Sequence, residues 1–217
     1  MCGRIVVKDV GEDIFEVADL SKVGKLTARY NIAPSQKTPV LRKSEQGVEL
    51  IELQWGLIPH WVKDLSKTKP QINARSETAA EKPFFRDSFK KSRCLIPVNG
   101  FYEWKKEGDK KQPYYISLES DKVFCFAGLC SKWSGGEESR ETFAILTCEP
   151  NDVMKPIHNR MPVILSKDNY KLWLEGNREE VTKLLVPAEN AGMTAFPVST
   201  YVNSPRNQGL KCIERLS

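Results

Sequence analysis

The sequence predicts a single α+β domain built on a bent, barrel-like antiparallel sheet with a few peripheral helices. Short strand-like runs outnumber helical segments, and no strand–helix–strand alternation indicates a parallel sheet. A chain of 217 residues, 40% of them hydrophobic, can bury one sizeable core. No repeat, low-complexity linker or shift in composition divides it. We therefore expect one domain over residues 1–217.

The expected strands are short runs of aliphatic, aromatic and β-branched residues, several of them bounded by Gly, Pro, Asn or Asp. In chain order they are Arg4–Val7, Thr38–Arg42, Val48–Trp55, Leu95–Val98, Phe101–Trp104, Tyr114–Leu118, Val123–Cys130, Phe143–Cys148, Val163–Leu165 and Ala195–Val198. Between the fifth and sixth lies Lys-Lys-Glu-Gly-Asp-Lys-Lys at 105–111, which is typical of a hairpin tip with a solvated turn.

Helical segments are fewer. We expect helices at Asp13–Leu20, at Ser76–Ser92 with an interruption at Pro83, at Ser166–Leu174 with Ser166 as N-cap, and at Arg178–Val186, together with a short turn at Asn151–Met154. Proline interrupts the second because its ring clashes with the preceding turn.

Composition limits the classes of function. The net charge of +5 permits an anionic partner without requiring one. No apolar run approaches the ~20 residues of a membrane span. The first thirty residues carry five acids, unlike a signal or transit peptide, so we expect a cytoplasmic protein, nucleoid-associated if bacterial, with no membrane partner.

The six cysteines show no metal-ligand spacing and lie mostly in apolar runs. In a chain without a secretion signal they are expected to be reduced, buried thiols. With only His60 and His158 beside them, we expect no metal, and nothing in the sequence calls for a cofactor.

The chain opens Met-Cys-Gly-Arg, so removal of Met1 would give Cys2 a free α-amine and a thiol on adjacent carbons. An α-amine has a pKa of about 7.7–8.0, so part of it is uncharged and nucleophilic at neutral pH. Such a 1,2-aminothiol can trap an aldehyde as an imine, which the sulfur then closes to a thiazolidine ring.

Five polar and aromatic runs are not explained by secondary-structure propensity. They are Arg29-Tyr-Asn-Ile-Ala-Pro34, Trp55-Gly-Leu-Ile-Pro-His-Trp61, Asn73-Ala-Arg75-Ser-Glu77, the segment Arg93–Trp104, and His158-Asn-Arg-Met-Pro162. Taken singly, each has an ordinary structural interpretation: Asn31 and Pro34 would make a turn, and Trp55 and Trp61 would be core.

Taken together, in this order and spacing, these runs resemble the SRAP family (SOS response-associated peptidase), whose members recognise abasic sites in single-stranded DNA. The resemblance extends from Met-Cys-Gly-Arg to Val198-Ser-Thr-Tyr-Val-Asn203, nearly the whole chain. It implies a DNA-damage protein that captures abasic sites in single-stranded DNA through a thiazolidine at Cys2, shielding the lesion.

The resemblance also implies roles for individual residues. The catalytic set is Cys2, Asn73, Glu103 and His158, in which the amide holds the captured sugar and the carboxylate and imidazole move protons. Arg4, Arg75 and Arg160 match positions that hold flanking phosphates. Trp61 and Trp104 are candidate stacking surfaces, although Trp104 fits a core position equally well. Lysines near 63–69 and the basic segment 86–93 would line an electrostatic groove.

Three alternatives remain open at this point. The first is an N-terminal-nucleophile amidohydrolase, which would need an amide-carbonyl pocket and an oxyanion hole. The second is a thiol peptidase that acts on itself to remove Met1, using Cys2, His158 and Glu103. The third is a non-covalent single-strand DNA binder, for which Cys2 would be dispensable. We expect a monomer in every case.

Overall fold

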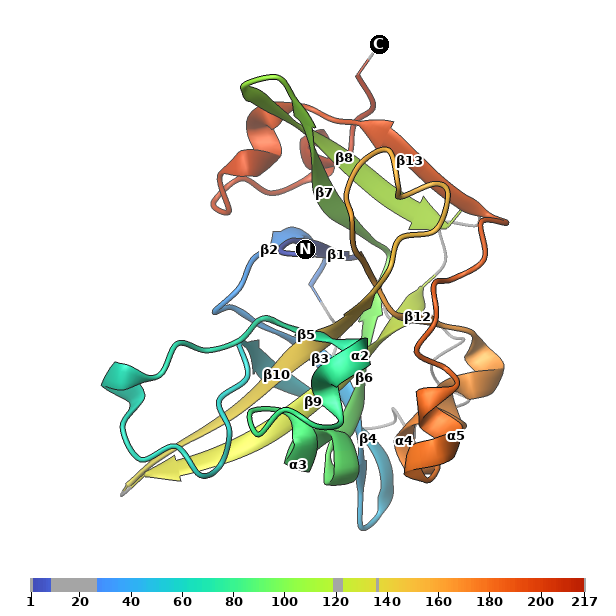
Figure 1. Ribbon diagram of the computed structural model, residues 1–217. Helices are drawn as coiled ribbons and strands as arrows, with labels where there is room; N and C mark the ends of the chain where they lie inside the picture. Colours follow the sequence, from blue (N-terminus) through green and yellow to red (C-terminus); the bar gives the residue numbers. More distant parts are fainter. Residues whose placement is uncertain (1, 9–26, 119–122, 136, 217) are drawn as a thin grey trace.

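The protein is built on two β-sheets (Figure 1). The structure is a computed structural model that describes residues 2–8, 27–118, 123–135 and 137–216. The smaller sheet has the order β13-β8-β7-β1-β2. Its strands are β1 (Ile5–Val7), β2 (Arg29–Ile32), β7 (Gly100–Glu107), β8 (Lys110–Leu118) and β13 (Met193–Pro197). All of its pairings are antiparallel.

The larger sheet closes on itself. Its strands are β3 (Lys37–Ser44), β4 (Gly47–Trp55), β5 (Asn73–Arg75), β6 (Arg93–Val98), β9 (Phe124–Gly135), β10 (Glu138–Cys148), β11 (Met161–Pro162) and β12 (Ile164–Leu165). The order β10-β4-β3-β6-β9 is completed by a pairing of β9 with β10, so these strands make a ring. The predicted bent, barrel-like α+β architecture is therefore confirmed. The parallel pairings of β10 with β4 and with β5 were not predicted.

The main core fills the closed ring and extends to the smaller sheet. Buried aromatic residues such as Trp55, Phe126 and Phe143 lie at its centre, and Cys2, Ile5 and Phe101 belong to the same cluster. A second, smaller cluster lies on the opposite face of the smaller sheet, around Tyr102 and Tyr115. The strand β7 thus separates two apolar clusters, because its alternate side chains point to opposite faces.

The helices are short. They are η1 (Leu65–Lys67), α2 (Ser76–Ala79), α3 (Arg86–Lys91), η2 (Lys167–Asn169), α4 (Tyr170–Glu175), α5 (Arg178–Thr182), η3 (Thr200–Asn203) and η4 (Leu210–Cys212). The predicted break at Pro83 is confirmed, since the chain leaves α2 before it and enters α3 after it. Ser166 precedes η2 but its side chain does not cap it: its hydroxyl accepts from Asn169 Nδ2 at 2.8 Å instead.

All ten predicted strands are present with shifted ends, and the hairpin tip is confirmed at Gly108 and Asp109. Gly108 has a φ of 59°, which glycine adopts without the steric cost that a side chain would impose. The predicted helix at 13–20 lies outside the described residues. No described helix has the length and apolar character needed to cross a membrane.

Candidate active site

The backbone of Cys2 lies where the two sheets meet. Cys2 is fully buried just before β1 of the smaller sheet, and Asn73 begins β5 of the larger one (Figure 1). The Asn73 amide donates from Nδ2 to the Cys2 carbonyl oxygen at 2.8 Å. Its other polar atom, Oδ1, is buried with no hydrogen-bond partner among the described residues. Asn73 therefore anchors Cys2 and keeps one acceptor available.

A pocket of about 410 Å³ opens on this region. It is lined by Arg4, Glu103, Trp104, Lys111, His158 and Asn203. These residues come from β7, β8, the segment before β1, the segment before β11 and the η3 turn. The structure thus gathers four residues of the predicted site around one cavity, namely Arg4, Glu103, Trp104 and His158.

Glu103 is the acid of the pocket and it is only 2% exposed. Burial raises the pKa of its carboxyl, because a charged carboxylate loses solvation, while the nearby His158 acts in the opposite direction. Burial also raises the pKa of the Cys2 thiol, and the charge of Glu103 adds to that rise. The thiol is thus a weak acid that needs a neighbouring base to lose its proton.

His158 is oriented by its own loop. The backbone N–H of Arg160 lies 3.0 Å from His158 Nδ1 and the Arg160 carbonyl oxygen lies 3.2 Å from the same nitrogen, so the loop has a partner for Nδ1 in either tautomer. The charge of His158 lowers the pKa of Glu103, so the two side chains interact electrostatically. An acid and a base of different type therefore share the pocket, as general acid–base catalysis requires.

Arg160 is held in place by an ion pair. Its guanidinium donates to both carboxylate oxygens of Glu77, at 2.5 and 2.9 Å, and to the Thr147 carbonyl oxygen. Arg160 in turn lowers the pKa of Glu77 through these hydrogen bonds. A bidentate pair of this kind fixes the loop that carries His158.

Arg4 is held differently, by neutral oxygens. Its guanidinium donates to Asn31 Oδ1 at 2.6 Å and to the Val202 carbonyl oxygen at 2.7 Å, and it lies over the Trp104 ring at 5.7 Å. Burial lowers the pKa of Arg4. Among the described residues no carboxylate pairs with it, so its positive charge is not neutralised.

Asn31 was interpreted from the sequence only as a turn residue, and this was incomplete. It lies in β2, is fully buried, and donates from Nδ2 to the carbonyl oxygens of Ser204 and Asn207, both at 2.9 Å. Asn31 thereby ties the C-terminal segment to β2 while orienting Arg4. The sequence signal that could have revealed it is a polar residue inside a run of strand-forming residues.

Trp104 is half-buried rather than fully core. Its Nε1 donates to Asn203 Oδ1 at 2.8 Å, which fixes the ring at the pocket wall. Trp61 is 49% exposed and meets Phe84 edge to face, but it does not line this pocket. Arg75 is exposed at the end of β5, also outside the pocket, and its side chain makes no hydrogen bond or ion pair with another described residue.

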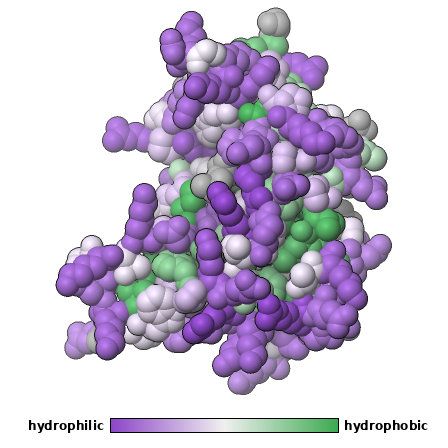
Figure 2. Space-filling model, viewed as in Figure 1, coloured by the Kyte–Doolittle hydropathy of each residue, from purple (hydrophilic) through white to green (hydrophobic). Residues whose placement is uncertain are grey.

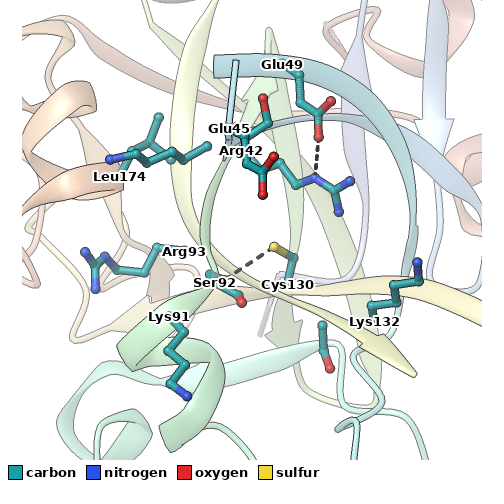
Figure 3. Close-up of a pocket in the computed structure, with 12 residues that line it drawn as sticks. Arg42, Glu45, Glu49, Lys91, Ser92, Arg93, Cys130, Lys132 and Leu174 are labelled. Atoms are coloured by element: carbon teal, nitrogen blue, oxygen red, sulfur yellow. Dashed lines mark hydrogen bonds and ion pairs between the residues drawn. The ribbon is translucent and has the colours of Figure 1, made fainter. Parts of the chain in front are cut away.

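A second cavity, of about 440 Å³, lies between the β3–β4 hairpin, α3 and β9 (Figure 3). Arg42 there pairs with Glu49 at 2.7 Å and with Glu141 at 2.6 Å. Cys130 Sγ donates to the Ser92 carbonyl oxygen at 3.4 Å. All six cysteines are buried free thiols. No group of His, Cys, Asp or Glu in the described part of the chain has the arrangement of a metal site.

The fold and the pocket define a class of protein in which a cysteine at position 2 is anchored between two sheets beside a buried acid. A family model described as SOS response associated peptidase (SRAP) matches residues 1–205. The chain belongs to the SRAP family.

Relatives with assigned names share this family. The chain is 40% identical to the abasic site processing protein YoaM of Bacillus subtilis, over 99% of this chain and 98% of that protein. It is 31% identical to the abasic site processing protein YedK of Escherichia coli, over 99% of both. The corresponding protein HMCES of Xenopus tropicalis is 33% identical over 87% of this chain and 66% of its own length.

Solved structures agree with the fold. A protein from Bacteroides thetaiotaomicron has a TM-score of 0.84 at 28% identity and is covered over the full length of both chains. A phage-related protein from Bordetella bronchiseptica has a TM-score of 0.70 at 30% identity, over 91% of this chain and 94% of that one.

Proposed function

We propose that this protein captures abasic sites in single-stranded DNA covalently, through Cys2 after Met1 has been removed, and so shields the lesion from strand cleavage. The names of its relatives support abasic sites as the target. The 1,2-aminothiol supports the chemistry, because the open-chain sugar of an abasic site carries an aldehyde.

The reaction balances with the loss of one water. The Cys2 amine adds to the aldehyde carbon, and the resulting carbinolamine loses its hydroxyl as water to give an imine. The thiol sulfur then bonds to the imine carbon, and the thiol proton ends on the nitrogen. Each step needs a proton delivered to an oxygen or nitrogen, or removed from one. Glu103 and His158 are the groups proposed to move these protons.

The observation that carries the proposal is the position of Cys2. Asn73 Nδ2 donates to the Cys2 carbonyl oxygen at 2.8 Å, and the negative charge of Glu103 contributes to the raised pKa of the Cys2 thiol. Glu103 lines the pocket that also holds His158. A residue needed only for packing would not require a buried acid beside it, since burying a carboxylate is costly. The Asn73 Oδ1 atom, which has no partner among the described residues, is proposed to accept a hydrogen bond from a hydroxyl of the captured sugar.

Binding is proposed to use charge and stacking without reading sequence. Arg4 carries a positive charge that no described carboxylate neutralises, and Trp104 forms part of the pocket wall beside it. Arg75 and Arg160 are proposed to contact flanking phosphates. Arg160 would do so either by breaking its ion pair with Glu77 or by binding the carboxylate and a phosphate together. Trp61 is proposed to stack on a base outside the pocket. Stacking on aromatic rings favours unpaired bases, so a single strand is the expected form. We propose that the protein acts as a cytoplasmic monomer.

The test is capture of an oligonucleotide that carries one abasic site. The protein without Met1 should give a product that survives denaturing electrophoresis, whereas an oligonucleotide with a tetrahydrofuran analogue, which has no aldehyde, should give none. Affinity for the analogue should be greater for single-stranded than for double-stranded DNA and should fall as salt rises. No product with the natural abasic site would refute the proposal.

A further inference from the structure

The hairpin of β7 and β8 places two lysines directly opposite each other. The register pairs Lys106 with Lys111, and both are exposed. Residues directly opposite in an antiparallel pair have Cβ atoms only ~4.5–5.5 Å apart, and like charges in such positions are destabilising. Neither lysine makes an ion pair with another described residue. The fold thus sets two exposed lysines side by side in the hairpin with no acidic partner in the described part of the chain.

The other two lysines of the hairpin are compensated. Lys105 Nζ lies 3.2 Å from Glu107 Oε1, and Lys110 stands opposite Glu107 in the register. Because alternate residues of a strand face opposite sides, Lys105 and Lys110 lie on one face of the hairpin and Lys106 and Lys111 on the other. The uncompensated charges are therefore confined to one face.

That face continues into the candidate active site. Trp104 is two residues before Lys106 and shares its face, and Lys111 itself lines the pocket beside Arg4 and Trp104. Arg4, whose guanidinium is bound only by neutral oxygens, lies against the Trp104 ring. Figure 2 shows that the end of the molecule with this hairpin is mostly hydrophilic. Arg4, Lys111 and Lys106 form a row of positive charges that leads out of the pocket, which we call the hairpin row.

We propose that the hairpin row binds consecutive phosphates of the DNA strand on one side of the abasic site, with Lys106 and Lys111 acting as a clamp. This inference rests on the proposed function. It adds the surface along which the DNA strand leaves the pocket. Two ammonium groups on one face suit a chain of singly charged phosphodiesters, which would relieve their mutual repulsion.

The test measures equilibrium affinity without covalent chemistry. Single-stranded oligonucleotides with a central tetrahydrofuran site are titrated with the full-length protein and followed by fluorescence anisotropy. The variants are Lys106→Gln, Lys111→Gln and the double variant, with Lys110→Gln as the matched control on the opposite face. Each clamp variant should weaken binding about fivefold at low salt, the loss of one close charge pair. The double variant should reduce the slope of log affinity against log salt by about 1.4, or ~0.7 for each lost phosphate contact.

Truncated strands locate the contact. One oligonucleotide ends just 5′ of the site and another just 3′ of it. The difference between wild type and the double variant should disappear with one of them and persist with the other. The thermal midpoint of the double variant should be equal to or higher than that of wild type, because repulsion across the hairpin is removed.

Three results would overturn the clamp. One is a double variant that binds like Lys110→Gln, and a second is a difference that survives both truncations, which would indicate a diffuse field. The third is wild-type protein that fails to bind any of these strands, which would overturn the proposed function as well. Covalent capture of a natural abasic strand, measured at saturating DNA, separates the two proposals. Lys110→Gln, which lies outside the pocket and the hairpin row, should capture at the wild-type rate there, and absence of capture by wild type would refute the proposed covalent chemistry but not the clamp.

Discussion

Two cavities of this protein, one beside α3 and one beside Cys2, use the same residue types in opposite ways. In the cavity beside α3, Arg42 is paired with Glu49 (Figure 3) and also with Glu141, and each of these carboxylates is partly exposed. In the pocket beside Cys2, Arg4 donates to neutral oxygens and pairs with no carboxylate of the described residues, while the acid, Glu103, is almost fully buried with a raised pKa. The paired charges of Arg42 and its two glutamates, in the cavity beside α3, stabilise the β3–β4 hairpin. The separated charges of Arg4 and Glu103, in the pocket beside Cys2, are costly to keep and are available to a substrate.

The largest expected difference concerns the two acids. Glu103→Gln should slow capture of an abasic strand on the order of 10²-fold or more, since a proton-transfer group is lost, while binding of the tetrahydrofuran strand is unchanged. Glu49→Gln should leave the capture rate unchanged and lower the free energy of unfolding by about 0.5 kcal/mol, as for a partly exposed ion pair. Single-turnover gel assays and thermal melts measure both. Equal capture rates for the two variants would remove Glu103 from the mechanism.

Glu103 should also make the stability of the protein depend on pH. Burial raises the pKa of Glu103 in the folded state above its unfolded value, so the folded protein binds this proton more tightly. Its contribution to stability therefore falls as pH rises from the unfolded value of about 4.3 through the folded value, and the loss is complete above that. Melts of Glu103→Gln between pH 4 and 8 should show less of this decline than wild type. An identical decline would place the titration elsewhere.

His158→Ala should slow capture by a similar factor, on the order of 10²-fold, because the pocket loses its second proton-transfer group. Binding of the tetrahydrofuran strand should change little, since Arg4 and Lys111 keep their charges. Single-turnover capture gels and anisotropy titrations measure the two quantities. A variant that captures at the wild-type rate would leave Glu103 to act without His158.

A smaller effect is expected from the anchor of Cys2. Asn73→Ala removes the donor to the Cys2 carbonyl and should slow capture about tenfold, the cost of one lost hydrogen bond to a buried acceptor. Asn177→Ala, which removes the N-cap of α5 far from the pocket in sequence, is the control for lost stability without lost capture. If both variants slow capture equally, the effect of Asn73 is general destabilisation.

The smallest expected effect concerns Arg160, which resembles the paired arginine of the other cavity. Glu77→Gln should free its guanidinium for a phosphate and strengthen binding of single-stranded DNA about fivefold. Anisotropy titrations at two salt concentrations measure this gain. The control is Glu81→Gln, which removes the looser and more exposed ion-pair partner of Arg178. A loss of affinity in Glu77→Gln would mean that the ion pair itself shapes the DNA-binding surface.

The strands could be predicted from sequence because they are apolar runs of β-forming residues bounded by turn residues. The strands β2 and β5 could not, since their residues Tyr30, Asn31, Asn73 and Arg75 are polar and their pairing depends on distant partners, and β11 could not because it has only two residues. The parallel pairing of β10 with β4 escaped prediction for the same reason. It brings together segments almost ninety residues apart, and no local pattern encodes it.

The site shows a similar division. The types and order of Cys2, Glu103 and His158 indicated the chemistry, but not that Arg160 would be bound by Glu77 or that Arg4 would lack an acidic partner. Lys106 and Lys111 were interpreted as a solvated turn, and their exposure agrees with that interpretation. What the sequence could not reveal is that the hairpin register sets them opposite one another on the face that reaches the pocket.

The most direct test of the account is the intact mass of the protein after reaction with a single strand carrying one abasic site. We expect the mass of the protein without Met1 plus that of the DNA minus one water, with the adduct on the N-terminal peptide after digestion. Cys2→Ser keeps the amine and should lose the stable adduct. A variant with an uncleavable extension before Cys2 has an amide in place of the amine and should trap nothing. A stable adduct on the extended variant, or on any peptide that lacks Cys2, would contradict the account.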